Sequence, residues 1–267
     1  MTDYPGPIVV VNHVEAVPRR IRAVLGGTTV VDTIAARYVW EWPFYPQYYV
    51  PLADIVQGAL HGDGRRRLDS RGEVEMATLR VGDLERRSAV TVVRESSLEG
   101  LADTARFEWT ALDAWYEEDE QVFVHPRSPY VRVDALRSTR RVRVEHAGVC
   151  VAESSSPVMV FETGLPTRYY LNRGDVDFTH LIPSDTVSEC PYKGRTSASW
   201  SIDVGGERGV DLAWSYDFPT SELLAVAGLV AFYNESVDTF VDGRPMERPQ
   251  THFKLGPRRS HGRPAAP

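Results

Sequence analysis

The strongest constraint on the fold is that the sequence repeats itself. When residues 20–54 are set against residues 141–175 without a gap, nine of the 35 positions are identical, whereas two unrelated sequences of ordinary composition would share about two. The identities include a turn glycine, a glutamate and two adjacent tyrosines, at Gly27, Glu41, Tyr48 and Tyr49 in the first stretch and at Gly148, Glu162, Tyr169 and Tyr170 in the second. This pattern predicts two diverged tandem copies of one domain.

The similarity resumes further along with a small shift, which fixes the extent of each copy. The resumed matches set Leu98, Ala102, Phe107 and Asp113 against Leu223, Ala227, Phe232 and Asp238. A connector with two prolines and no apolar period spans 125–139. We therefore expect an extension over 1–18, a first copy over 19–124, a second over 140–244, and a disordered Pro- and Arg-containing tail over 245–267.

The local patterns within a copy are those of antiparallel strands. Apolar and polar residues alternate over 141–153 around Ala147-Gly148, a turn signal that Gly26-Gly27 repeats in the first copy. Further predicted strands are 158–161, 168–171, 200–204 and 211–216. One short helix is expected from Pro219-Thr220-Ser221 to Gly228. The fold class predicted is mainly β: two tandem β-tent-like antiparallel domains, each with about one short helix.

Composition excludes several classes of function. The net charge of −7 disfavours nucleic acid and anionic membranes as partners, and no stretch has the roughly 20 apolar residues of a membrane helix. The N-terminus lacks the features of a signal peptide, so we expect a cytoplasmic protein. Two cysteines and seven scattered histidines give no recognisable metal site, and no cofactor is predicted. The acidic run 117–120 is expected to be a solvated face.

The loop Cys190-Pro191-Tyr192-Lys193-Gly194 of the second copy carries the most reactive set of side chains. Proline and glycine favour a tight turn that presents a thiol, a phenol and an amine together. A lysine beside a thiol lowers the thiol pKa and favours the thiolate, and a desolvated lysine could itself attack a carbonyl. The alternative is a buried cysteine in a turn whose lysine is solvated.

Two further groups of residues accompany that loop. Glu162 and Arg168 flank a Gly-Leu-Pro turn, so they could pair with each other or grip a polar ligand. Tyr169 and Tyr170 follow directly, and their alternative role is packing. The third group is Trp214 and Tyr216, which alternate on one face of a strand and which packing would also explain.

A comparison of the copies places the predicted site in the second one. Glu41 and the paired tyrosines remain in the first copy, but Gln47 stands where the second copy has Arg168. The reactive loop is matched by residues 67–71, Arg-Leu-Asp-Ser-Arg, which contain no thiol and no lysine. The first copy is therefore interpreted as a degenerate, structural or lid-like partner.

The motifs of the second copy resemble a known family. The strings FETGLPTRYYL, CPYKG, DLAWSY and GLVAFYNE lie within residues 139–245 and together resemble the domain-of-unknown-function family numbered 427. The resemblance implies a β-tent-like fold, similar to B-type methionine sulfoxide reductases and glutathione-dependent formaldehyde-activating enzymes. Some catalogues label the family a nucleotidyltransferase, but the chain has neither a Gly-Ser loop with paired aspartates nor a P-loop. Ser199 also departs from the family, which usually has tyrosine before the tryptophan at 200.

Two hypotheses about function remain open on the sequence. In the first, a small-molecule pocket lies in the second copy, either as a binding site or as a catalytic site. Cys190 or Lys193 would be the nucleophile, Glu162 and Tyr192 acid–base groups, and Arg168 the substrate anchor, with Tyr169, Tyr170, Trp214 and Tyr216 as further binding residues. In the second, the chain is a non-catalytic binding or scaffold protein whose copies form a pseudo-dimer. The expected state is a monomer or a weak homo-oligomer. The first hypothesis requires Glu162, Arg168, Tyr192 and Lys193 to line a common cavity.

Overall fold

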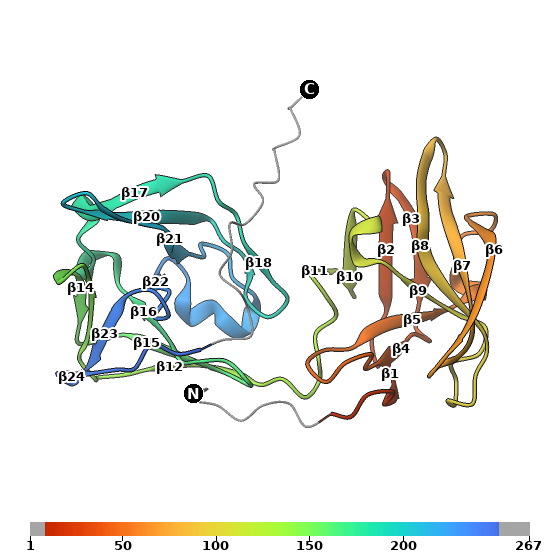
Figure 1. Cartoon of the computed structure of the whole chain (residues 1–267), viewed down its shortest axis with the longest axis horizontal. Coiled ribbons are helices and arrows are strands. Elements are labelled where there is room, and N and C mark those ends of the chain that lie inside the picture. Colours follow the sequence, from red (N-terminus) through yellow and green to blue (C-terminus); the bar gives the residue numbers. More distant parts are fainter. Residues whose placement is uncertain (1–8, 251–267) are drawn as a thin grey trace. The chain divides into compact units, whose positions relative to one another are not determined.

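The computed structural model describes residues 9–250, which divide into two units at Tyr130 and Val131 (Figure 1). Each unit contains a seven-stranded and a four-stranded antiparallel sheet. The N-terminal unit corresponds to the first copy and the C-terminal unit to the second. The predicted fold class, two tandem mainly β antiparallel domains, is therefore confirmed.

The N-terminal unit orders its strands β1-β4-β5-β9-β8-β7-β6 and β11-β10-β2-β3. Two 3-10 turns, η1 (Leu52–Asp54) and η2 (Trp109–Ala111), connect strands. The strands are β1 Val14–Ala16, β2 Ile21–Leu25, β3 Thr28–Thr33, β4 Arg37–Val39, β5 Gln47–Pro51, β6 Leu60–Asp69, β7 Gly72–Val81, β8 Leu84–Glu95, β9 Thr104–Phe107, β10 Ala114–Glu117 and β11 Glu120–Val122.

The C-terminal unit repeats this order as β12-β15-β16-β22-β21-β20-β17 and β14-β13-β23-β24, and it adds the two-stranded pair β18-β19. Its 3-10 turns are η3 (Arg173–Asp175), η4 (Phe178–His180) and η5 (Ser221–Val226). The strands are β12 Val133–Arg137, β13 Val142–His146, β14 Val149–Ser154, β15 Val158–Glu162, β16 Arg168–Leu171, β17 Leu181–Ser184, β18 Glu189–Cys190, β19 Gly194–Arg195, β20 Ala198–Val204, β21 Glu207–Ser215, β22 Val230–Phe232, β23 Asp238–Val241 and β24 Arg244–Pro245.

The hairpin turns predicted from the repeat are present in both units. Gly26 and Gly27 have φ of 57° and 75°, and Ala147 and Gly148 have φ of 48° and 76°. Two consecutive residues with positive φ are what the two-residue turn between twisted strands requires. This backbone conformation explains why a glycine stands at the second position of the turn in each copy.

The aspartates that match between the copies also have one shared task. Thr33 donates a hydrogen bond through its hydroxyl to Asp54 at 2.5 Å, and Ser154 donates to Asp175 at 2.6 Å. In each unit this bond ties the end of one strand to a 3-10 turn. The repeated aspartate is therefore a fold residue.

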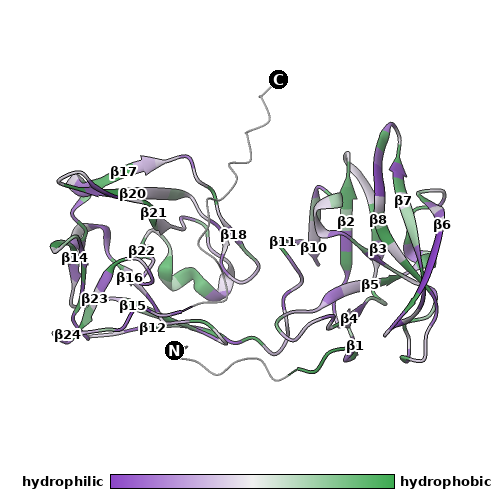
Figure 2. Cartoon of the chain, in the orientation of Figure 1, coloured by the Kyte–Doolittle hydropathy of each residue, from purple (hydrophilic) through white to green (hydrophobic). Residues whose placement is uncertain are grey.

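Each seven-stranded sheet buries both of its faces. The main core of each unit lies between the two sheets, and a smaller cluster covers the other face of the larger sheet. Because side chains alternate along a strand, Tyr169 enters the main core whereas Tyr170 enters the smaller cluster. Solvated strands are found at the sheet edge, where β6 is hydrophilic along most of its length (Figure 2).

Several expected boundaries differ in the structure. The connector expected over 125–139 contains β12, which pairs with β15 and so belongs to the larger sheet. The extension expected over 1–18 contains β1, which pairs with β4. Most of the expected tail, residues 251–267, lies outside the described residues.

The expected helix is a 3-10 segment, η5, interrupted at Leu223. The Thr220 side chain makes no capping bond there, because its hydroxyl donates to the Tyr192 carbonyl instead. Among residues 9–250, no helical segment is long and apolar enough to cross a membrane.

The acidic run is exposed at residues 118–120, as expected, but Glu117 is buried rather than solvated. Its side chain is 1% exposed and pairs with Arg19 and Arg127 at 2.6 and 2.8 Å. The Tyr48 hydroxyl also donates to Glu117 at 2.5 Å. A buried carboxylate persists only with such compensation, so this group is a structural ion cluster of the N-terminal unit.

The turn at Ala147-Gly148 provides a test of the fold. Gly148→Val places a β-branched residue at φ 76°, so we expect the C-terminal unit to lose about 1–3 kcal/mol of unfolding free energy. Gly148→Asn, whose side chain tolerates this conformation, should lose less. Urea unfolding of the full chain measures both, and equal losses would show that the positive φ is not the cause.

Candidate functional site

The predicted reactive loop forms a tight hairpin against the second face of the larger sheet. Cys190 in β18 pairs with Gly194 in β19, so Pro191, Tyr192 and Lys193 form the tip. Gly194 has φ of 91°, which the sharp return after the tip requires. Thr220, just before η5, holds this tip by donating its hydroxyl to the Tyr192 carbonyl at 2.7 Å and its amide to the Lys193 carbonyl at 3.3 Å.

The centre of the site is a buried ion pair. The Lys193 ammonium donates to the Glu162 carboxylate of β15, and the two side chains are only 10% and 7% exposed. Burial acts to lower the pKa of Lys193, but the neighbouring Cys190 sulfur and Glu162 carboxylate outweigh it and hold that pKa above its ordinary value. Lys193 is therefore protonated at neutral pH and has no lone pair for attack on a carbonyl.

The Cys190 thiol lies beside this pair, with Sγ 3.7 Å from Lys193 Nζ. The residue keeps some solvent exposure, but the burial of its thiol raises the pKa above the ordinary value. Lys193 acts to lower the pKa of Cys190, as expected from the sequence, whereas the nearby Glu162 acts to raise it further. Because burial prevails, Cys190 is a protonated thiol at neutral pH, which agrees with the buried cysteine of the alternative interpretation rather than with the thiolate.

Three aromatic residues line the same face. The Trp214 indole donates to the Tyr170 hydroxyl at 3.3 Å, and the two rings meet edge-on. Burial raises the pKa of Tyr170 to about 12 and raises that of Tyr216 well above its ordinary range. Both phenols therefore stay protonated, and with Trp214 they form part of the small cluster that covers this face.

Arg168 has an acid partner that the sequence reasoning missed. Its Nη2 donates to Glu235 Oε1 at 2.5 Å, and Asn234 accepts a further bond. Its guanidinium also lies 5.9 Å from the centre of the Trp214 ring. Arg168 thus pairs with Glu235 rather than with Glu162, and both members of the pair are largely buried. No local sequence pattern indicates this pairing, because the two residues are 67 positions apart in the chain.

The structure therefore brings together only part of the predicted site. The residues that meet at the second face are Glu162, Lys193, Cys190 and Tyr170, with Trp214 and Tyr216 beside them. Arg168 forms a neighbouring cluster with Glu235, and Tyr169 lies in the main core on the opposite face. Two surface hollows of the chain, one in each unit, are lined by other residues.

The same arrangement occurs in the N-terminal unit. Asp69 pairs with Gly72 across the β6–β7 turn as Cys190 pairs with Gly194. Arg71, directly before that glycine, therefore occupies the position of Lys193. Its guanidinium donates to Glu41 and to the Tyr49 hydroxyl at 2.5 Å each, and to Asp69 at 2.6 Å.

The interpretation of the first copy as one that lost the site needs correction. The first copy does lack the thiol and the lysine, but it keeps a cation on the matching glutamate. The sequence match of residues 67–71 to residues 190–194 set Arg71 against Gly194, whereas the strand register sets it against Lys193. The hairpin tip has three residues in the C-terminal unit and two in the N-terminal unit. A glutamate paired with a hairpin-tip cation is thus common to both copies, buried at Glu162 and partly exposed at Glu41.

A pair of substitutions at Lys193 tests its role in the fold. Lys193→Met leaves the Glu162 carboxylate buried without its cation, so we expect a loss of about 3–5 kcal/mol in unfolding free energy. Lys193→Arg supplies the cation that the first copy uses and should lose much less. Urea unfolding of the full chain measures both, and similar losses for the two variants would contradict a structural role for the charge.

The raised pKa of Lys193 predicts a dependence of stability on alkaline pH. A group whose pKa is higher in the folded than in the unfolded state stabilises fully below the unfolded value, here about 10.5, and the contribution disappears as pH rises through the folded value. Wild type should therefore lose stability more steeply above pH 10.5 than Lys193→Arg, which stays protonated. Parallel thermal unfolding curves for the two proteins from pH 9 to 12 would refute this.

Comparison with known proteins agrees with the repeat. The family model described as Domain of unknown function (DUF427) matches the chain twice, over residues 13–118 and 134–243. No curated protein matches the chain. Because the two matches cover most of the sequence and coincide with the two sets of sheets, the chain belongs to the DUF427 family as a tandem of two copies.

Proposed function

We propose that this chain is a non-catalytic binding protein built from two copies of one β domain. The observation that carries the proposal is that the matching glutamate of each copy holds a hairpin-tip cation, Lys193 on Glu162 and Arg71 on Glu41. An arginine cannot act as a nucleophile or give up its proton in a protein. The shared role of this position is therefore to fasten the hairpin.

The protonation states of the second copy support the same proposal. A nucleophilic mechanism needs a thiolate or a neutral amine, whereas the pKa of Cys190 and that of Lys193 are both raised. Glu162 is engaged by the ammonium and Arg168 by Glu235, so neither is poised for a substrate. The catalytic alternative would require Lys193 to leave its partner before any chemistry began.

The partner proposed is a small molecule rather than a nucleic acid. The net charge of −7 opposes binding to phosphate backbones. A cytoplasmic location remains part of the proposal, which the two free cysteines support.

Thiol labelling against pH tests the proposal. In a Cys150→Ser background only Cys190 can react with iodoacetamide, and a protonated, buried thiol should label slowly at neutral pH, with a midpoint above the free-thiol value of about 8.5. Rapid labelling of the native protein at pH 6–7 would show a thiolate and would restore the catalytic alternative. Labelling in urea, where the thiol is exposed, is the control for reagent access.

A further inference from the structure

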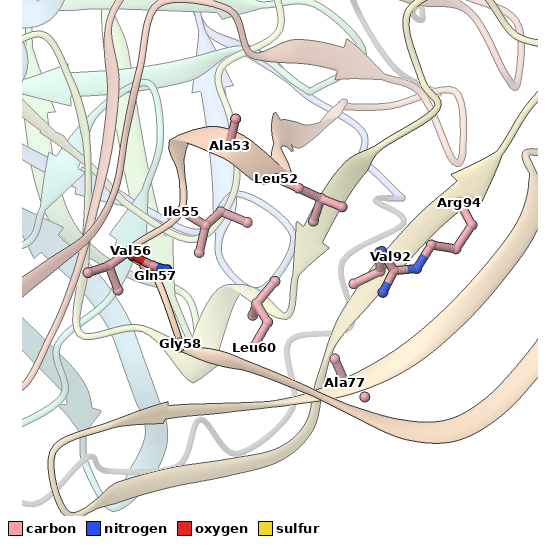
Figure 3. A pocket seen from close by; sticks show the side chains of 11 residues that line it. Leu52, Ala53, Ile55, Val56, Gln57, Gly58, Leu60, Ala77, Val92 and Arg94 are labelled. Carbon is pink, nitrogen blue, oxygen red and sulfur yellow. The ribbon is translucent and has the colours of Figure 1, made fainter.

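A hollow of about 490 Å³ opens at the surface of the N-terminal unit, beside η1 and the strands β6 to β8 (Figure 3). Its apolar lining comes from Leu52, Ile55, Leu60, Ala77 and Val92, and Arg94 lies at its side. Ala77 and Val92 belong to the main core, so the hollow reaches down to the core between the two sheets. Binding sites for small molecules usually have about 300–1,000 Å³.

The strand register identifies the residues that stand at this place in the other copy. Gly62 pairs with Ala77 across β6 and β7 in the N-terminal unit, and Pro183 pairs with Trp200 across β17 and β20 in the C-terminal unit. Each of these is the third pair of its ladder, counted from Leu60–Leu79 in the first copy and from Leu181–Ile202 in the second. Trp200 is therefore the counterpart of Ala77.

A second aromatic residue follows from the same comparison. Val56 donates its amide to the Val30 carbonyl, and Asp177 donates to the Val151 carbonyl, each at 2.9 Å. The residue after Val56 is Gln57, which lines the hollow. The residue after Asp177 is Phe178. The first copy thus has alanine and glutamine where the second has a tryptophan and a phenylalanine.

In the C-terminal unit these two aromatic side chains pack on each other. The Phe178 and Trp200 rings are 5.7 Å apart in an edge-to-face arrangement, and Trp200 is buried in the main core. The Arg173 guanidinium lies over both rings, at 5.0 and 5.4 Å from their centres. The second copy therefore fills with its own aromatic rings the space that the first copy leaves open.

The polar group of the hollow is Arg94. Its Nε and Nη2 donate to Glu75 Oε2 at 3.1 and 3.0 Å, which fixes the guanidinium, while 43% of its side chain stays exposed. Glu75 pairs with Val92 and Ala198 pairs with Ser215 in the matching ladders, so Ala198 corresponds to Glu75. Two residues further along stand Arg94 in the first copy and Asp217 in the second, so the Glu75–Arg94 pair occurs in the first copy only. An oriented, partly exposed guanidinium is a strong donor to a carboxylate.

We propose that this hollow binds an aromatic carboxylate. Its ring occupies the place that the Trp200 indole takes in the second copy, and its carboxylate accepts hydrogen bonds from Arg94. The inference deepens the proposed binding function by naming a site and a class of ligand for the N-terminal unit. The sequence predicted the ligand site in the second copy. This inference instead places an open site in the first copy.

Calorimetric titration of the full chain with indole-3-carboxylate and with neutral indole tests the site. We expect one saturable site per chain, with the carboxylate bound more tightly than indole. Arg94→Gln should weaken the carboxylate about tenfold and leave indole unchanged. Equal affinity for the two probes in both proteins would overturn the role of Arg94.

Filling variants test the location. Ala77→Trp imitates the second copy and should weaken binding of both probes at least tenfold. If this variant fails to fold, Gln57→Phe, which fills the hollow from its rim, should weaken binding in the same way. Trp200→Ala should open the matching hollow in the C-terminal unit and add a second site for indole. The carboxylate should gain little there, because Asp217 stands in place of Arg94.

The possible failures are distinguishable from one another. No saturable binding of either probe, or binding that both filling variants leave unchanged, would overturn the inference and leave the labelling result for Cys190 untouched. A reactive Cys190 thiolate would overturn the non-catalytic proposal without altering the affinity for the probes.

Discussion

A carboxylate–cation pair fastens the tip of a hairpin beside the second face of each larger sheet. The apolar cover of that face comes from Leu223 and Val226 of η5 in the C-terminal unit and from Leu101 in the N-terminal unit. Taking two charges out of water is unfavourable, but leaving one of them without its partner is worse. Because Glu162 is buried at the end of β15, the hairpin tip has to bring a cation to it, and Arg71 does the same for the partly buried Glu41.

The two copies differ in what surrounds this common pair. Asp69 and the Tyr49 hydroxyl surround Arg71 in the first copy, whereas the Cys190 thiol lies beside Lys193 in the second. A guanidinium has five N–H donors and needs more acceptors around it than an ammonium, which has three. The Cys190 thiol thus stands where the first copy has the Asp69 carboxylate. A structural role beside the hairpin-tip cation therefore explains the presence of the thiol, and no reaction has to be invoked.

The opposite side of the sheet shows divergence of another kind. The second copy packs Trp200 and Phe178 into its core margin, whereas the first leaves a hollow bordered by Ala77. The first copy therefore lacks the stabilisation that two packed aromatic side chains would contribute. This loss is the physical reason to expect that the first copy was adapted to hold a ligand there.

Much of the fold could be predicted from the sequence, because the signals were local. The turn at Ala147-Gly148 and the alternating strands required only neighbouring residues. The pairing of Arg168 with Glu235 joins residues far apart in the chain, so no local pattern revealed it. The state of the Cys190 thiol depends on burial, which spacing does not encode. The expected helix near Thr220 became a 3-10 segment because Leu223 and Val226 pack against the sheet, and tertiary packing overrides propensity.

The central claim is that Glu162 and Lys193 act as one structural unit. A double-mutant cycle with Glu162→Gln, Lys193→Met and the combined variant measures their coupling in unfolding free energy directly. The account predicts a coupling of about 2–3 kcal/mol, with the double variant more stable than the sum of the single losses implies. A coupling near zero would show that the two groups stabilise the fold independently and would contradict the account.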